Sequence, residues 1–87
     1  MMKANETMKL IDIADKEGTL PAIAHLFKYE NFFIYEGFTT GERTLIKCLS
    51  DQRSIFLTET EDVFTLENGD LVVETESTIY TFEEVAG

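Results

Sequence analysis

The pair Asn68-Gly69 constrains the fold of this chain more than any other feature of its sequence. It separates two apolar-rich runs, and both residues accept the positive φ of a type I′ turn, which joins two strands in a tight hairpin. Counting outward from that turn places alternate residues on a core face, namely Phe64, Leu66, Leu71 and Val73. The opposite face then carries Val63, Thr65, Glu67, Asp70, Val72 and Glu74.

A second tight turn at Glu76-Ser77 adds the run Thr78 to Phe82 as a third strand. This register keeps the aromatic residues on the core face, with Leu71 opposite Phe82 and Val73 opposite Tyr80. The outer face gains three pairs: Asp70 with Glu83, Val72 with Thr81, and Glu74 with Ile79.

The segments before this hairpin predict two helices followed by more strands. Leu10, Ile13 and Ala14 recur at helical spacing within Thr7 to Glu17, and a second helix runs from Pro21 to about Lys28. Strands are expected in three segments: Phe32 to Tyr35, Thr44 to Leu49, and Ser54 to Thr58.

Together these elements predict one domain over residues 1–87, with residues 1–6 frayed. We expect an α+β fold in which two N-terminal helices pack on an antiparallel β-meander of about five to six strands. A strongly coiled small barrel is the competing architecture, and the sequence does not separate the two.

The charges of this chain are distributed unevenly. Residues 1–53 carry seven Lys and Arg against eight acids, a sum of −1, whereas residues 54–87 carry nine acids and no base, a sum of −9. DNA-binding and RNA-binding proteins show the opposite sign, so we expect no direct nucleic-acid binding. A basic protein partner is expected instead.

Residues that carry catalytic or metal chemistry are sparse. His25, the only histidine, is expected to face solvent beside Lys28, and Cys48 alternates with Ile46 as a small core residue. Asp62, Asn68 and Asp70 lack the glycine and terminal glutamate of a calcium loop, and no Cys/His cluster has zinc spacing. We expect no enzyme activity, no cofactor and no metal.

The single cysteine and the lack of a signal-peptide core or membrane-length apolar run predict a cytoplasmic protein with no membrane association. Monomer and homodimer are both left open by the sequence.

The acidic last third of the chain is the expected partner-binding site. Carboxylates two residues apart on a strand, such as Glu74 and Glu76, repeat at about 6.8 Å, comparable to the spacing of phosphates along one nucleic-acid strand. Val63, Val72 and Ile79 are expected to point outward among the acids, as at a protein interface. The expected contact residues are Glu61, Asp62, Glu67, Asp70, Val72, Glu74, Glu76, Ile79 and Glu83. The alternative is a solvated face that maintains solubility and blocks edge pairing.

A small acidic chain with an N-terminal helix and an antiparallel sheet resembles the uracil-DNA glycosylase inhibitors of bacteriophages, which are DNA mimics. The segment Leu10 to Gly18 is similar to that family's first helix, although the string Glu76-Ser77-Thr78-Ile79 stands in the last strand and carries an inserted Thr relative to the family's Glu-Ser-Ile. The resemblance implies an inhibitor that occupies the DNA-binding groove of a host enzyme in the cytoplasm of a bacterial host cell.

Three hypotheses follow from the sequence. The first is a DNA-mimic inhibitor of a host glycosylase, restriction enzyme or RNA-guided nuclease, with uracil-DNA glycosylase as the leading target. The second is a non-enzymatic interaction or assembly module, including anti-restriction or anti-CRISPR types, that pairs through the aromatic segment Phe32 to Phe38. The third is a small enzyme that uses His25 or Cys48.

Overall fold

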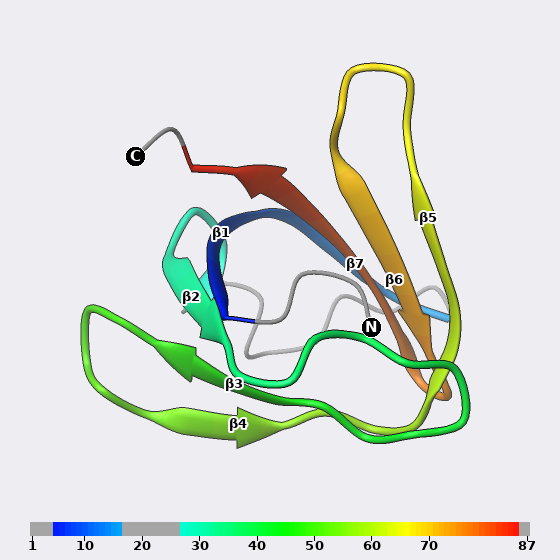
Figure 1. Ribbon diagram of the computed structural model, residues 1–87, viewed down its shortest axis with the longest axis horizontal. Coiled ribbons are helices and arrows are strands. Elements are labelled where there is room, and N and C mark those ends of the chain that lie inside the picture. Colours follow the sequence, from blue (N-terminus) through cyan, green and yellow to red (C-terminus); the bar gives the residue numbers. More distant parts are fainter. Residues whose placement is uncertain (1–4, 17–26, 86–87) are drawn as a thin grey trace.

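The computed structural model describes residues 5–16 and 27–85, which form one seven-stranded antiparallel sheet (Figure 1). The strands lie in the spatial order β4-β3-β2-β1-β7-β6-β5. Their bounds are β1 Glu6–Asp15, β2 Asn31–Ile34, β3 Leu45–Cys48, β4 Ser54–Phe56, β5 Thr60–Thr65, β6 Leu71–Thr75 and β7 Thr78–Glu84. The N-terminal strand is therefore central, between a meander of β2 to β4 and a meander of β5 to β7.

The helix expected over Thr7 to Glu17 is wrong, because these residues form β1 up to Asp15, and the described fold is all-β rather than α+β. A bulge in β1 between Leu10 and Asp12 explains the error. Met8 and Leu10 are buried at the two-residue period of a strand, but the next buried residue after the bulge is Ile13, three positions on. That step of three coincides with helical spacing.

Other expectations for the N-terminal third lie largely outside the described residues. These include most of the second helix, Pro21 to Lys28, together with His25. Of the start expected to be frayed, Glu6 begins β1, and the Asn5 N–H donates to the Ile34 carbonyl at 2.7 Å. No helix within 5–16 or 27–85 has the length and apolar character to cross a membrane.

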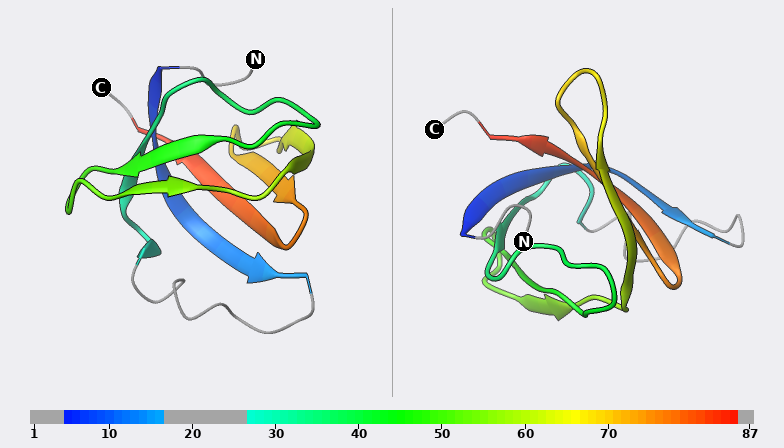
Figure 2. Two further views of the ribbon diagram at one scale, coloured as in Figure 1. Left: turned by 90° about the horizontal axis from the view of Figure 1, so that it is seen from below. Right: turned by 45° about the vertical axis from the view of Figure 1, so that its right-hand side comes forward.

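The sheet coils around its own core, so that β2, β3 and β4 face β1, β7 and β6 across it (Figures 1 and 2). Phe82 of β7 is fully buried and meets Phe38, in the loop after β2, at a ring-centroid distance of 5.7 Å. Burying such aromatic rings supplies much of the stabilisation of a small core. The described core consists of Met8, Leu10, Ile13, Phe27, Phe32, Ile34, Phe38, Ile46, Cys48, Leu57, Leu71, Val73 and Phe82.

The edges of this sheet, β4 and β5, follow each other in the chain, and the loop between β2 and β3 is tied to the first residue of β5. Gly41 N–H donates to the Thr60 carbonyl at 2.8 Å, and Thr60 N–H donates to the Glu42 carbonyl at 3.0 Å. The described sheet therefore resembles the coiled alternative more than a flat meander covered by helices.

The hairpin between β5 and β6 forms at the expected place but one residue out of the expected register. Leu66 N–H donates to the Asp70 carbonyl at 2.8 Å and Gly69 N–H donates to the Leu66 carbonyl at 2.9 Å, which encloses a three-residue loop. Only Gly69 of the Asn-Gly pair has a positive φ, +95°, as in a turn followed by a glycine bulge. The extra loop residue, Glu67, reverses every side chain of β5 relative to the two-residue turn.

The hairpin between β6 and β7 has the expected register. Leu71 pairs with Phe82, Val73 with Tyr80, Val72 with Thr81 and Glu74 with Ile79. Its turn at Glu76-Ser77 is stabilised in part by the side chain of Thr75, which directly precedes the turn. The buried Thr75 hydroxyl donates to the Thr78 carbonyl at 3.0 Å and lies 3.2 Å from the Thr78 N–H, from which it accepts.

Candidate functional site

The outer surface of β5, β6 and β7, on the side away from the core, brings together most of the expected contact residues. The pairing places Asp62, Glu74 and Ile79 in one row across the strands, and Phe64, Val72 and Thr81 in the next. Continuing the same register puts Asp70 and Glu83 at the far end of this surface. We call this surface the acidic face and define it by Asp62, Phe64, Asp70, Val72, Glu74, Ile79 and Glu83.

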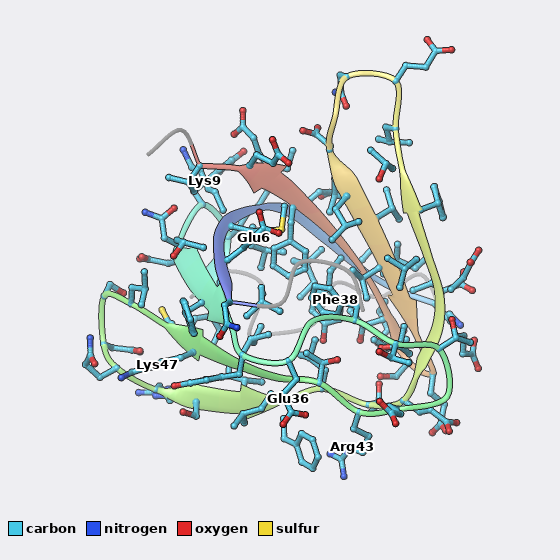
Figure 3. The ribbon with its side chains drawn as sticks, in the orientation of Figure 1. Glu6, Lys9, Glu36, Phe38, Arg43 and Lys47 are labelled. Carbon is cyan, nitrogen blue, oxygen red and sulfur yellow. The ribbon has the colours of Figure 1, made fainter. Side chains whose placement is uncertain are left out.

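Two lysines from β1 and its C-terminal end border the acidic face. Lys16 pairs with Glu61 and lies 3.6 Å from a Glu74 carboxylate oxygen. The hydrogen bond from Lys16 to Glu61 raises the pKa of this lysine, partly offset by desolvation. At the other end, Lys9 lies opposite Glu83 in the pairing of β1 with β7, and Figure 3 shows Lys9 beside the C-terminal end of β7. The carboxylates of Asp62, Glu67 and Asp70 form no ion pair with any described residue.

The one-residue change of register alters which apolar residues of β5 point outward. Val63 was expected to point outward but packs against the core, opposite Val73. Phe64 and Leu66 were expected in the core but are 45% and 41% exposed. Val72 lies on the acidic face as expected but is only 8% exposed, so Phe64 offers a partner more apolar contact area. The missed signal was the loop length, since a three-residue loop also accepts Asn-Gly.

The remaining expected contact residues lie around the acidic face rather than on it. Glu67 is exposed in the hairpin loop, Glu76 is exposed in the turn between β6 and β7, and Glu61 stands in a bulge of β5. Asp70 is held at the loop by Asn68, whose side-chain amide donates to the Asp70 carboxylate at 3.0 Å. The acids therefore extend from this loop, along the strands, to the opposite turn.

Comparisons with protein-family models, with curated proteins and with solved structures find no match for this chain. The geometry of the chain itself therefore carries the functional argument. The resemblance to uracil-DNA glycosylase inhibitors depended on a helix over Leu10 to Gly18, and the described part of this segment belongs to β1 and the turn after it. The specific target that it implied has lost that structural basis.

Of the two candidate catalytic residues, His25 and Cys48, Cys48 lies within the described residues and His25 does not. Cys48 is a fully buried core residue, as predicted, and its sulfur lies 3.3 Å from the Ser50 hydroxyl. A core cavity of about 30 Å³ has an apolar lining and has room for only one or two water molecules. Within the described ranges, no group of three His, Cys, Asp or Glu side chains could hold a metal ion.

Proposed function

We propose that this protein is a non-catalytic inhibitor whose acidic face occupies the basic, DNA-contacting groove of a DNA-binding protein. The observation that carries the proposal is the pairing of Asp62 directly opposite Glu74 on an outer surface that also exposes Phe64. Like charges placed directly opposite each other destabilise a sheet, and a basic partner would offset that repulsion.

The arrangement of charge along β6 supports a groove as the partner surface. Asp70 and Glu74 stand on the same outer face on either side of Val72, so they are two steps of about 6.8 Å, or about 13.6 Å, apart along the strand. Glu67 extends the line of negative charge into the loop of the hairpin. A rigid row of carboxylates that follows a strand can take the place of a row of phosphates in a basic groove.

The apolar part of the acidic face supports a protein partner over a purely solvated surface. Phe64 lies directly opposite Val72 and is surrounded by Asp62, Asp70 and Glu74 on the three-stranded surface. An apolar centre with a charged rim is typical of protein interfaces.

The experiment combines capture with competition by DNA. The immobilised wild-type protein captures partners from bacterial lysate, and each captured enzyme is then purified and bound to fluorescent duplex DNA. Addition of the wild-type protein is expected to displace the DNA, and displacement is expected to weaken steeply with salt. Purified uracil-DNA glycosylase, a restriction enzyme and an RNA-guided nuclease form a defined panel beside the captured proteins.

A pair of matched variants localises the contact. Asp62→Lys/Asp70→Lys reverses two charges of the acidic face, and Glu36→Lys/Glu42→Lys makes the same change in net charge at exposed residues outside it. We expect the first variant to lose DNA displacement and the second to retain it. Equal displacement by both variants, displacement that does not change with salt, or no displacement from any enzyme would refute the proposal.

A further inference from the structure

A second surface of this molecule has the opposite character to the acidic face. It lies on the outer side of β2, β3 and β4, together with Arg43 just before β3. Phe33 pairs with Lys47 and Leu45 pairs with Phe56 on this side of the sheet. We call it the aromatic-basic face and define it by Phe33, Tyr35, Arg43, Leu45, Lys47 and Phe56.

Four of the six side chains that define the aromatic-basic face, those of Phe33, Tyr35, Arg43 and Phe56, are held by contacts with one another or with the backbone. The Arg43 guanidinium lies 4.0 Å from the centre of the Phe56 ring, and its Nε–H donates to the Leu57 carbonyl at 2.9 Å. Phe33 and Tyr35 pack edge to face at 5.2 Å between ring centres. These four side chains therefore have little conformational freedom to lose when a partner binds. Phe56 and Leu45 are nevertheless 55% and 41% exposed, so large apolar groups remain open to solvent.

The cationic side chains of this face have few carboxylates nearby with which to form ion pairs. Lys47 forms no ion pair with any residue in the described ranges, and two cross-strand neighbours of this lysine are Phe33 and Ser54. The exposed carboxylate of Glu36 borders the face (Figure 3), and the exposed Glu42 directly precedes Arg43 in the chain. The face therefore offers apolar contacts and positive charge within a chain whose formal net charge is −10.

The loop end of the β5–β6 hairpin has the complementary chemistry. We call it the hairpin tip and define it by Phe64, Leu66, Glu67 and Asp70. It combines two exposed apolar side chains with two acids, and neither β5 nor β6 contains a basic residue. Its backbone is fixed by the hydrogen bonds between Leu66 and Asp70 and between Gly69 and Leu66. Each surface thus has exposed apolar groups and a charge of the opposite sign to the other.

The positions of the two surfaces determine how they can meet. The hairpin tip projects from one end of the molecule, and β3 and β4 lie at the other end (Figures 1 and 2). A contact between them cannot form within one chain. We propose that copies of this chain associate head to tail, with the hairpin tip of one copy bound to the aromatic-basic face of the next.

Such a contact joins two different patches and therefore leaves one free patch of each kind on every pair, so growth continues into a chain or a closed ring. Self-association of this kind also covers part of the acidic face. A foreign partner of that face would compete with it, but the association itself does not depend on the function proposed above.

The test uses two double variants, each of which alters one of the two surfaces. Leu45→Ser/Lys47→Ser changes the aromatic-basic face, and Phe64→Ser/Glu67→Ser changes the hairpin tip, so that neither altered surface keeps its charge or its apolar group; Leu45, Phe64 and Glu67 are exposed and Lys47 is half-buried. Molar mass is measured by light scattering and sedimentation over a range of protein concentration at low salt. Wild type is expected to increase in mass with concentration, and each variant alone is expected to stay monomeric.

An equimolar mixture of the two variants gives the decisive result. The intact hairpin tip of the first variant can bind the intact aromatic-basic face of the second, and the two remaining surfaces are both altered. The mixture is therefore expected to form a 1:1 dimer and nothing larger. A mixture that stays monomeric, a variant that associates as wild type does, or a wild type that is monomeric at every concentration would overturn the proposal.

Folding of the variants is checked independently. Circular dichroism establishes whether each double variant folds, and the milder Lys47→Ala and Glu67→Ala variants repeat the measurement if one does not. Each of these single variants is expected to require higher protein concentration than wild type to associate. A mass curve that coincides with the wild-type curve for both would contradict the proposed contact.

Discussion

Asp62 and Glu74 lie directly opposite each other on β5 and β6 and place two carboxylates on the same outer surface. Lys16 approaches Glu74 at 3.6 Å but pairs mainly with Glu61, so the repulsion between the two acids is only partly offset. We expect Asp62→Asn to raise the free energy of unfolding by about 0.2–1 kcal/mol at low salt. Urea denaturation measures this increase, with Glu36→Gln as the control variant. The increase in the free energy of unfolding should become smaller as salt screens the repulsion.

Thr60 of β5 and Thr75 of β6 also lie opposite each other, and their hydroxyl groups differ in hydrogen bonding. Both are buried, but the Thr60 hydroxyl has no hydrogen-bond partner among the described residues, whereas the Thr75 hydroxyl bonds both backbone groups of Thr78. We expect Thr60→Val to raise the free energy of unfolding by about 1 kcal/mol and Thr75→Val to lower it by about 1–3 kcal/mol. Thermal or urea unfolding of the two variants measures both changes, and a loss of stability in Thr60→Val would contradict the first.

Phe64 and Phe82 test the register of the β5–β6 hairpin. Phe82 is fully buried, so Phe82→Ala is expected to lower the free energy of unfolding by about 3–5 kcal/mol. Phe64 is 45% exposed, and Phe64→Ala is expected to cost about 1 kcal/mol or less. Phe82→Leu is a milder substitution if Phe82→Ala does not fold. Equal costs for the two alanine variants would place Phe64 in the core, as the two-residue turn predicts.

Tyr80 predicts how stability changes at alkaline pH. Burial raises the pKa of its phenol above the ordinary value of 10.0, and a hydrogen bond with Thr78 opposes part of that rise. The folded state then holds the Tyr80 proton more tightly than the unfolded state does. The stabilisation that results is complete below pH 10 and is lost as pH rises above it. Tyr80→Phe is expected to flatten the fall of unfolding free energy above pH 10. A variant that loses stability as steeply as wild type would contradict this.

Turn residues and alternation predicted the C-terminal half of this molecule well. The six strands expected from residue 31 onward are all present, and the register of β6 with β7 agrees pair by pair, from Leu71 with Phe82 to Glu74 with Ile79. These features are local, because a short connection leaves two neighbouring strands only a few ways to pair. The concentration of acid on β5 to β7 also follows from the sequence alone.

The errors arose where one extra residue changes which side of a strand is buried. In β1, the bulge between Leu10 and Asp12 converts a strand period into a helix-like step and hides the alternation. In β5, the extra loop residue Glu67 turns Val63 inward and Phe64 outward. Such single-residue shifts leave composition and average periodicity almost unchanged, so the sequence pattern does not reveal them.

The succession of strands from residue 31 onward and the distribution of charge along the chain can therefore be predicted from the sequence. The candidate site depends instead on contacts between distant segments. β1 is a strand because it pairs with β7, more than sixty residues away in the chain, and with β2 across the segment 17–26. The same pairing brings Lys16 to Glu61 and Glu74 and Lys9 to Glu83. The free energy of strand pairing and core burial is gained only in the folded sheet, so it overrides the local helical pattern of a segment such as Thr7 to Glu17.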